Sequence, residues 1–250
     1  MKIGRGKIWK IVKLLKSINI FNKYELGLLC LVSLLMIASG AGMPGFWSNF
    51  LALTSLITGC VFIVLVAKGS LWNYPFGLYN AASYAYIVYI FHEFGNVILF
   101  LFFFVPMLSI GWIGWYRNRK DTNKRGGEFE IKTKRLTCIS WAFALGGIII
   151  LTCVFKIFLK GFFGFDEHHV WLDSFSIAVP IITQILMNLR YQEQWYFWCL
   201  FSLANIVLWG VVYSENTNSL ALLISWIFFL GCSVYGHILW KKESVRLLQN

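Results

Sequence analysis

Four polar or aromatic residues near the carboxyl end of the chain are spaced so that they share one side of a helix. Within the apolar stretch 195–209, Trp198, Ser202, Asn205 and Trp209 follow one another at i, i+4, i+7 and i+11. Indole rings offer flat π-faces, and a buried amide needs hydrogen-bond partners that hydrocarbon does not supply. The pattern therefore predicts either a ligand-binding face or a polar contact between neighbouring helices.

A similar face lies 125 residues earlier in the chain. The identical residues at that spacing include Asn80 and Asn205, Gly111 and Gly236, and Trp115 and Trp240. The same register makes four residues equivalent to the first stripe, namely Asn73, Gly77, Asn80 and Tyr84. Weak internal similarity of this kind is typical of transporters whose ligand binds between two repeats. We therefore expect a duplicated chain with a site between its halves.

Two further amides lie in the apolar stretch 170–189. Gln184 and Asn188 are neighbours at i and i+4 on a helix. Asn and Gln donate and accept hydrogen bonds without carrying a charge, which suits a ligand rich in hydroxyl groups. Amides in membrane helices also bond between helices, so both interpretations stay open.

The sequence contains little that supports catalysis. It has no G-x-S-x-G, H-E-x-x-H, Walker or glycine-rich dinucleotide motif. The six cysteines form no C-x-x-C pair, and the acidic and histidine residues of 166–169, in a short loop between apolar runs, lack the spacing of a helical zinc site. The apolar runs also lack an acid–base pair for a proton relay. We therefore expect no enzyme, with no catalytic residues, no metal and no cofactor.

Composition indicates the class of protein. Of the 250 residues, 58% are hydrophobic and 13% are charged, which is typical of a helical protein that crosses a membrane several times. The net charge of +11 does not indicate nucleic-acid binding, because the Lys and Arg residues lie in short segments between apolar runs. The lipid bilayer is therefore an expected partner, and nucleic acid is not.

Eight apolar runs predict eight transmembrane helices. They lie at about 25–41, 46–67, 72–91, 95–116, 137–158, 170–189, 195–213 and 219–240. If all eight cross, 20 of the 22 Lys and Arg residues lie on the cytoplasmic side, and only Lys156 and Lys160 lie outside. This distribution predicts that the amino and carboxyl termini both lie in the cytoplasm.

Charge distribution and internal similarity together predict an all-α integral membrane protein with one helix before a 3 + 1 + 3 arrangement. We expect a basic amphipathic segment and first transmembrane helix (1–45), a first three-helix repeat (46–116), a cytoplasmic linker with a connecting helix (117–169), a second three-helix repeat (170–240) and a cytoplasmic tail (241–250). Because one connecting helix reverses the chain direction, the two repeats run parallel.

Three segments resemble the PnuC family of vitamin transporters. They are Trp72-Asn-Tyr-Pro-Phe-Gly-Leu-Tyr-Asn80, the segment from Gly111 to Tyr116, and the Gln194-Trp195…Trp198…Asn205 pattern, and the resemblance covers residues 46–240. It implies parallel three-helix repeats, distantly similar to those of SWEET sugar transporters. It also implies uptake of nicotinamide riboside by facilitated diffusion, maintained by phosphorylation of the substrate in the cytoplasm. The oligomeric state that the family suggests is a trimer.

The chemistry of nicotinamide riboside matches the candidate residues. Trp and Tyr faces attract its cationic pyridinium by about 0.5–2 kcal/mol per contact, and amides suit its carboxamide and ribose. We therefore expect the substrate to contact Trp72, Asn73, Asn80, Tyr84, Gln184, Asn188, Trp198, Ser202, Asn205 and Trp209. Two alternatives stay open: a facilitator of thiamine or riboflavin with the same fold, and a membrane assembly subunit that transports nothing.

Overall fold

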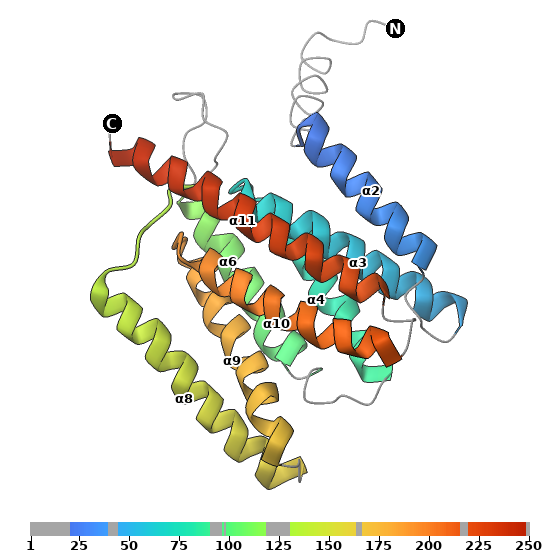
Figure 1. Cartoon of the computed structure of the whole chain (residues 1–250). Helices are drawn as coiled ribbons and strands as arrows, with labels where there is room; N and C mark the ends of the chain where they lie inside the picture. Colours follow the sequence, from blue (N-terminus) through green and yellow to red (C-terminus); the bar gives the residue numbers. More distant parts are fainter. Residues whose placement is uncertain are drawn as a thin grey trace, which may run out of the picture.

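The computed structural model describes residues 21–39, 45–90, 97, 99–118, 131–163, 167–215 and 220–248. Among these residues β-structure is limited to isolated bridge positions, such as the bridge between Lys134 and Tyr191, and no strand is formed, so the expected all-α fold is confirmed. In chain order the elements are α2 (Lys23–Ser39), α3 (Phe46–Ala67), α4 (Asn73–Ile90), the π-helical segment η1 (Leu99–Phe104), α6 (Val105–Arg117), α8 (Cys138–Phe163), α9 (Glu167–Asn188), α10 (Gln194–Glu215) and α11 (Leu220–Leu248) (Figure 1).

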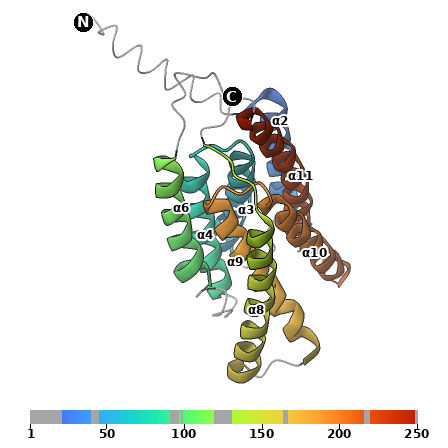
Figure 2. The same ribbon diagram turned by 90° about the vertical axis from the view of Figure 1, so that its left-hand side faces the viewer.

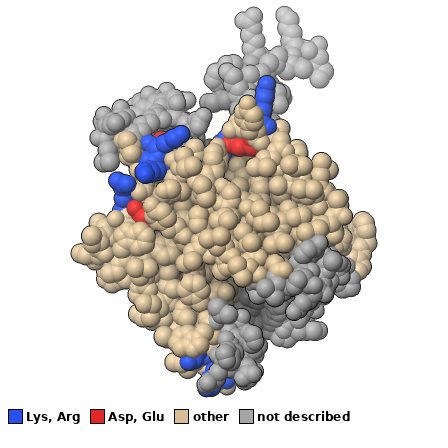
Figure 3. All heavy atoms as spheres, in the orientation of Figure 1, with Lys and Arg blue, Asp and Glu red and all other residues tan. Residues whose placement is uncertain are grey.

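The helices follow the eight predicted apolar runs, with η1 and α6 forming one continuous segment. In the described part of the chain, four helical segments are long and apolar enough to cross a membrane: Phe46–Ala67, Leu99–Arg117, Cys138–Gly161 and Leu220–Val245. In Figure 3 the charged side chains of the visible face lie toward its upper and lower ends, and the described part of the broad band between them shows none. These features agree with a multi-pass membrane protein.

Six helical segments pack in a closed ring. α3 packs against α4, α4 against η1 and α6, α6 against α9, α9 against α10, α10 against α11, and α11 returns to α3. Consequently α4 and α10 lie on opposite sides of the ring. Outside it, α8 packs against α9, and α2 packs against α3 and α11 (Figures 1 and 2). We call α3, α4 and η1–α6 the first triplet, and α9, α10 and α11 the second triplet.

The two triplets contain the same turn between their first and second helices. Backbone N–H groups bond to the carbonyl groups of the preceding helix in one pattern: Lys68 to Val64, Gly69 to Val66 and Ser70 to Leu65 after α3, and Leu189 to Ile185, Arg190 to Met187 and Tyr191 to Leu186 after α9. Gly69 and Arg190 share one position, with φ of 61° and 68°. Glycine tolerates this left-handed conformation, and Arg190 adopts it because the turn requires it. Matched residues are 121 positions apart, as from Gly69 to Arg190.

The closing helix of each triplet bonds to the first helix of the other. Trp115 of α6 donates its indole N–H to the Met187 carbonyl of α9 at 3.1 Å, and Trp240 of α11 donates to the Val66 carbonyl of α3 at 3.1 Å. The two acceptors are again 121 residues apart, whereas the two tryptophans are 125 residues apart. These bonds connect the triplets in the same way on both sides of the ring.

The two indoles belong to an aromatic cluster at one end of the ring. Tyr74, Trp115, Trp195 and Trp240 are fully buried, and their neighbouring ring centroids are between 5.3 and 6.0 Å apart. Gly236 permits this packing, because a Cβ there would overlap the Trp195 ring. We call this end of the ring the tryptophan end.

The two spacings differ by four residues, which is about one helical turn. The difference agrees with the lengths of the second helices, since α10 has 22 residues and α4 has 18. At the spacing of 121, Asn73 corresponds to Gln194 and Gly77 to Trp198. The 121-residue register therefore applies to the turn and the helix starts, and the 125-residue register applies to the tryptophans of the closing helices. The pairing of Asn80 with Asn205 stays a prediction.

Other expectations for connecting segments have mixed outcomes. The basic segment 1–20 and residues 119–130 of the linker lie outside the described residues. α9 begins at Glu167, so residues 167–169 belong to a helix and not to a loop. The end of the linker packs onto the turn after α9: Lys134 N–H donates to the Arg190 carbonyl at 2.8 Å, and Gln192 N–H donates to the Lys134 carbonyl at 2.9 Å. The linker thus satisfies backbone groups that this turn leaves unpaired.

Candidate substrate site

One face of α10 carries buried polar atoms. Gln194, Trp198 and Ser202 follow one another at i, i+4 and i+8, and their side chains are at most 7% exposed. Among the described residues, both amide atoms of Gln194, the Trp198 Nε1 and the Ser202 Oγ have no hydrogen-bond partner. Buried polar groups are normally paired in proteins. This face therefore offers hydrogen bonds to a polar ligand.

The face of α10 points into the ring. Trp198 belongs to the main apolar core, which also contains residues of α3, α4, α6 and α11. Phe197, the preceding residue, packs instead with α8 and α9 in a second, smaller core. Since Gln194 and Ser202 lie one turn before and after Trp198, all three belong to the inner face of α10.

The start of α4 adds polar groups on the opposite side of the ring. Asn73 and Tyr74 are fully buried. Asn73 donates its amide N–H to the Ser70 carbonyl at 2.6 Å, while its Oδ1 and the Tyr74 hydroxyl have no partner among the described residues. Farther along α4 the two sides differ, because Gly77 occupies the position that corresponds to Trp198. The aromatic face of the site thus comes from the second triplet.

Several of the predicted site residues use their amide groups to bond to other residues of the protein. Asn80 donates its amide N–H to the Ser55 carbonyl of α3 at 2.7 Å. Gln184 donates to Asn188 Oδ1 at 3.0 Å, and Asn188 donates to the Met107 carbonyl of α6 at 2.7 Å. For Asn80 and Asn188 the structure therefore shows the interhelical bonds that the sequence left as an alternative.

The other predicted residues lie in varied surroundings. Trp72 precedes α4 and is 52% exposed. Tyr84 is half-buried, with its ring centroid 4.7 Å from that of Phe100. Asn205 is half-buried and bonds to the Phe201 carbonyl of its own helix at 2.9 Å. The Trp209 side chain lies outside the described part of the structure, although its backbone belongs to α10.

Sequence reasoning missed Gln194 and Tyr74 as candidates. Gln194 lies one turn before Trp198, so extending the predicted stripe backwards by four residues finds it. Tyr74 has no comparable sequence signal, because its burial depends on packing against Trp115 of another helix. Near both residues, Arg190 is 8% exposed, and burial lowers the pKa of its guanidinium.

A ring of apolar helices that encloses aromatic and uncharged polar side chains is the architecture of a membrane transporter for a small polar molecule. Residues 49–242 match the family described as "Nicotinamide mononucleotide transporter". The chain therefore belongs to this family, which is the PnuC family that the sequence motifs resemble.

Individual relatives agree with this assignment. The chain is 34% identical over 200 residues to the nicotinamide riboside transporter PnuC of Neisseria mucosa, covering 78% of this chain and 73% of that protein. It is 31% identical over 194 residues to PnuC of Haemophilus influenzae, covering 78% and 80%. The crystal structure of the vitamin B3 transporter PnuC superposes with a TM-score of 0.73 at 31% identity, covering 90% of this chain and 94% of the other.

Proposed function

We propose that this chain imports nicotinamide riboside by facilitated diffusion. The observation that carries the proposal is the identity of 34% and 31% to two proteins named nicotinamide riboside transporter PnuC. The similarity to the crystal structure of a vitamin B3 transporter supports the same substrate class. The inner faces of α4 and α10 offer aromatic rings and uncharged amides, which suit a cationic pyridinium, a carboxamide and a ribose.

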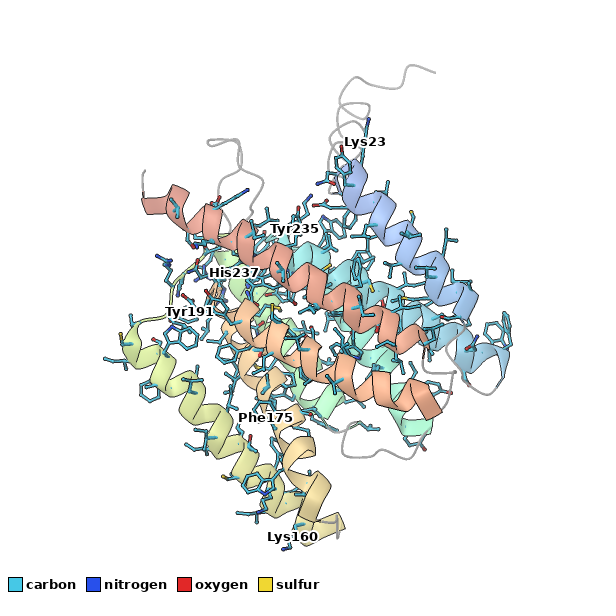
Figure 4. All side chains as sticks on the ribbon, viewed as in Figure 1. Lys23, Lys160, Phe175, Tyr191, Tyr235 and His237 are labelled. Carbon is cyan, nitrogen blue, oxygen red and sulfur yellow. The ribbon has the colours of Figure 1, made fainter. Side chains whose placement is uncertain are left out.

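In the proposed arrangement, eight helices cross the bacterial inner membrane and both termini are cytoplasmic. The repeated turn and the paired indole bonds support two parallel three-helix repeats, related by an axis along the membrane normal. α8 is the connecting helix between them. Figure 4 places Lys23 and Lys160 at opposite ends of the molecule, as the charge distribution requires, and the tryptophan end then faces the cytoplasm.

The substrate lies inside the ring, between α10 and α4. Trp198 holds the pyridinium through its ring face, while Gln194, Ser202 and Asn73 bond to the carboxamide and ribose. The other predicted residues line or support the pathway: Trp72, Asn80, Tyr84, Gln184, Asn188, Asn205 and Trp209. Among them, Asn80 and Asn188 act through their bonds to α3 and α6.

Uptake into liposomes tests the mechanism. Purified protein in liposomes that contain no kinase should let labelled nicotinamide riboside reach the outside concentration and go no further. In cells, phosphorylation of the entering substrate then maintains the gradient. Accumulation above the outside concentration, driven by a sodium or proton gradient, would contradict facilitated diffusion. We also propose that the protein is a homotrimer, as the family suggests, and the mass of the detergent-solubilised protein tests this.

A binding titration tests the substrate. Nicotinamide riboside should bind more tightly than thiamine, riboflavin or nicotinamide mononucleotide. The mononucleotide adds a phosphate, and burying an unpaired charge next to uncharged groups is unfavourable. We expect it to bind at least about tenfold more weakly, which corresponds to ~1.4 kcal/mol. Equal affinity for the mononucleotide would overturn nicotinamide riboside as the preferred substrate, while the family assignment would stand.

A further inference from the structure

Glu25, at the start of α2, connects three separate parts of the chain. Its Oε2 accepts hydrogen bonds from the Asn22 backbone N–H at 2.7 Å and from the Lys68 ammonium at 2.8 Å. Its Oε1 accepts one from the Tyr235 hydroxyl at 2.7 Å. Lys68 follows α3, and Tyr235 lies on α11 (Figure 4). One carboxylate therefore joins α2 to both triplets.

The start of α2 holds this carboxylate in place. Asn22 and Glu25 cap the helix reciprocally, since the Glu25 N–H donates to Asn22 Oδ1 at 2.8 Å while the Glu25 carboxylate accepts from the Asn22 N–H. Glu25 is 9% exposed and the Lys68 side chain 16%. A buried, pre-positioned carboxylate makes stronger hydrogen bonds than one on an open surface. The contact is thus more than a surface ion pair.

The two interfaces between the triplets differ at this point. Between α6 and α9, the Trp115 bond is accompanied by the bond from Asn188 to Met107. Between α3 and α11, the Trp240 bond is accompanied by the connection through Glu25. By the spacings of 121 and 125, Lys68 and Tyr235 correspond to Leu189 and Ile110, which are apolar and exposed. The interface between α6 and α9 therefore has two polar connections, both made by helices of the ring. At the interface between α3 and α11 the second polar connection comes from α2, which lies outside the ring.

We propose that Glu25 is a positioning residue for transport. Its bonds to Lys68 and Tyr235 hold α3 and α11 together at the tryptophan end, and they break when that end opens. The proposal rests on the proposed function, because transport by alternating access requires the triplets to move relative to each other. Glu25 lies on a helix outside the ring, so its loss leaves the substrate contacts in place.

Three variants test the connection: Glu25→Gln, Lys68→Met and Tyr235→Phe. In liposomes we expect each to raise the maximal uptake rate about threefold or more, since a bond that exists in only one of two states shifts the balance between them. The dissociation constant for nicotinamide riboside should stay within about twofold of the unmodified protein. Lys241→Met, an exposed lysine of the same helix as Tyr235, is the matched control and should change neither quantity.

A charge exchange separates this role from simple packing. The double variant Glu25→Lys with Lys68→Glu rebuilds the ion pair in reverse, so its uptake rate should return toward the original value. Unchanged rates in all three single variants would overturn the proposal. A parallel loss of affinity and uptake would also overturn it, because Glu25 would then support the fold alone.

Thiol modification gives a readout that needs no substrate. Cys232 is 5% exposed and lies three residues before Tyr235 on α11. Its alkylation, followed by mass spectrometry, should be faster in the three single variants and slow again in the charge exchange. If alkylation follows this pattern while nicotinamide riboside does not bind, the substrate assignment fails and the role of Glu25 stands. Alkylation that is equally slow in every variant would contradict it.

Discussion

Asn80 and Trp198 are both candidate substrate contacts, yet their side chains have opposite surroundings. The Asn80 amide is paired with the Ser55 carbonyl, so it contributes to the stability of the α3–α4 contact. The Trp198 Nε1 is buried without a partner in the described part of the chain. A polar group that is already paired adds little when a ligand arrives, whereas an unpaired one gains a bond. At the scale of residues, this difference separates side chains that can bind the substrate from side chains that stabilise the helix contacts.

We therefore expect Trp198→Leu to weaken binding of nicotinamide riboside by about 0.5–2 kcal/mol, through loss of the ring face. Its melting temperature should also fall, because leucine leaves a cavity in the main apolar core, so affinity is the quantity that decides the role of the indole. Asn80→Leu is the matched comparison: it removes the interhelical bond to the Ser55 carbonyl, which then keeps its bond from the Thr58 hydroxyl of its own helix, so the melting temperature should fall while affinity stays unchanged. Affinity and melting temperature are measured on the same samples. Full affinity in Trp198→Leu would show that the indole is packing only.

At the scale of elements, α11 contains two glycines with different neighbours. A Cβ at Gly236 would lie 2.6 Å from Cε2 of Trp195, whereas a Cβ at Gly231 would meet nothing within 4 Å. Trp195 lies in the first turn of α10, so Gly236 sets how closely α11 approaches the start of that helix. The tryptophan end depends on this close contact.

Gly236→Ala should lower the free energy of unfolding by about 1–3 kcal/mol, the usual effect of overpacking a well-filled core. Gly231→Ala on the same helix should leave it unchanged or raise it slightly, since alanine favours helix. Thermal melting in detergent measures both. Equal melting temperatures for the two variants would mean that Trp195 moves aside without cost.

The positions of the helices were predictable from the sequence. The correspondence between the two halves and the hydrogen bonds between helices were predictable only in part. Long apolar runs reveal the elements, and identical residues reveal the register of the closing helices at Trp115 and Trp240. The matching turns escaped notice because they share backbone conformation and not residue type, with Gly69 in one and Arg190 in the other. The acceptor of Asn188 is the backbone of Met107, which no side-chain pattern identifies.

At the scale of the whole molecule, the charges at the two ends support the proposed orientation, in which the tryptophan end faces the cytoplasm. Arg117, Lys241 and Lys242 are exposed near the tryptophan end. Lys160 lies at the opposite end of the molecule, beyond the uncharged band (Figures 3 and 4). This asymmetry follows the positive-inside rule.

Reporter fusions test the orientation. A reporter at residue 43 should lie outside the cell and one at residue 120 inside, because in the proposed arrangement α2, α3, α4 and the η1–α6 segment, which precede the linker, each cross the membrane once. Alkaline phosphatase and green fluorescent protein, which are active on opposite sides, provide the measurement. The same side for both positions would remove the eight-span arrangement and the parallel repeats built on it.

The extra turn of α10 indicates which differences in helix length the two halves can tolerate. Each residue of a helix rotates the next by about 100°, so a change of four residues restores nearly the same phase. An insertion of one or two residues before Trp198 would turn its indole away from the ring and toward α9 or the lipid. Length differences between the halves are therefore confined to whole turns wherever a helix lines the pathway. Because of this constraint, halves that differ in length can still direct equivalent positions into the ring, even where the residue types differ.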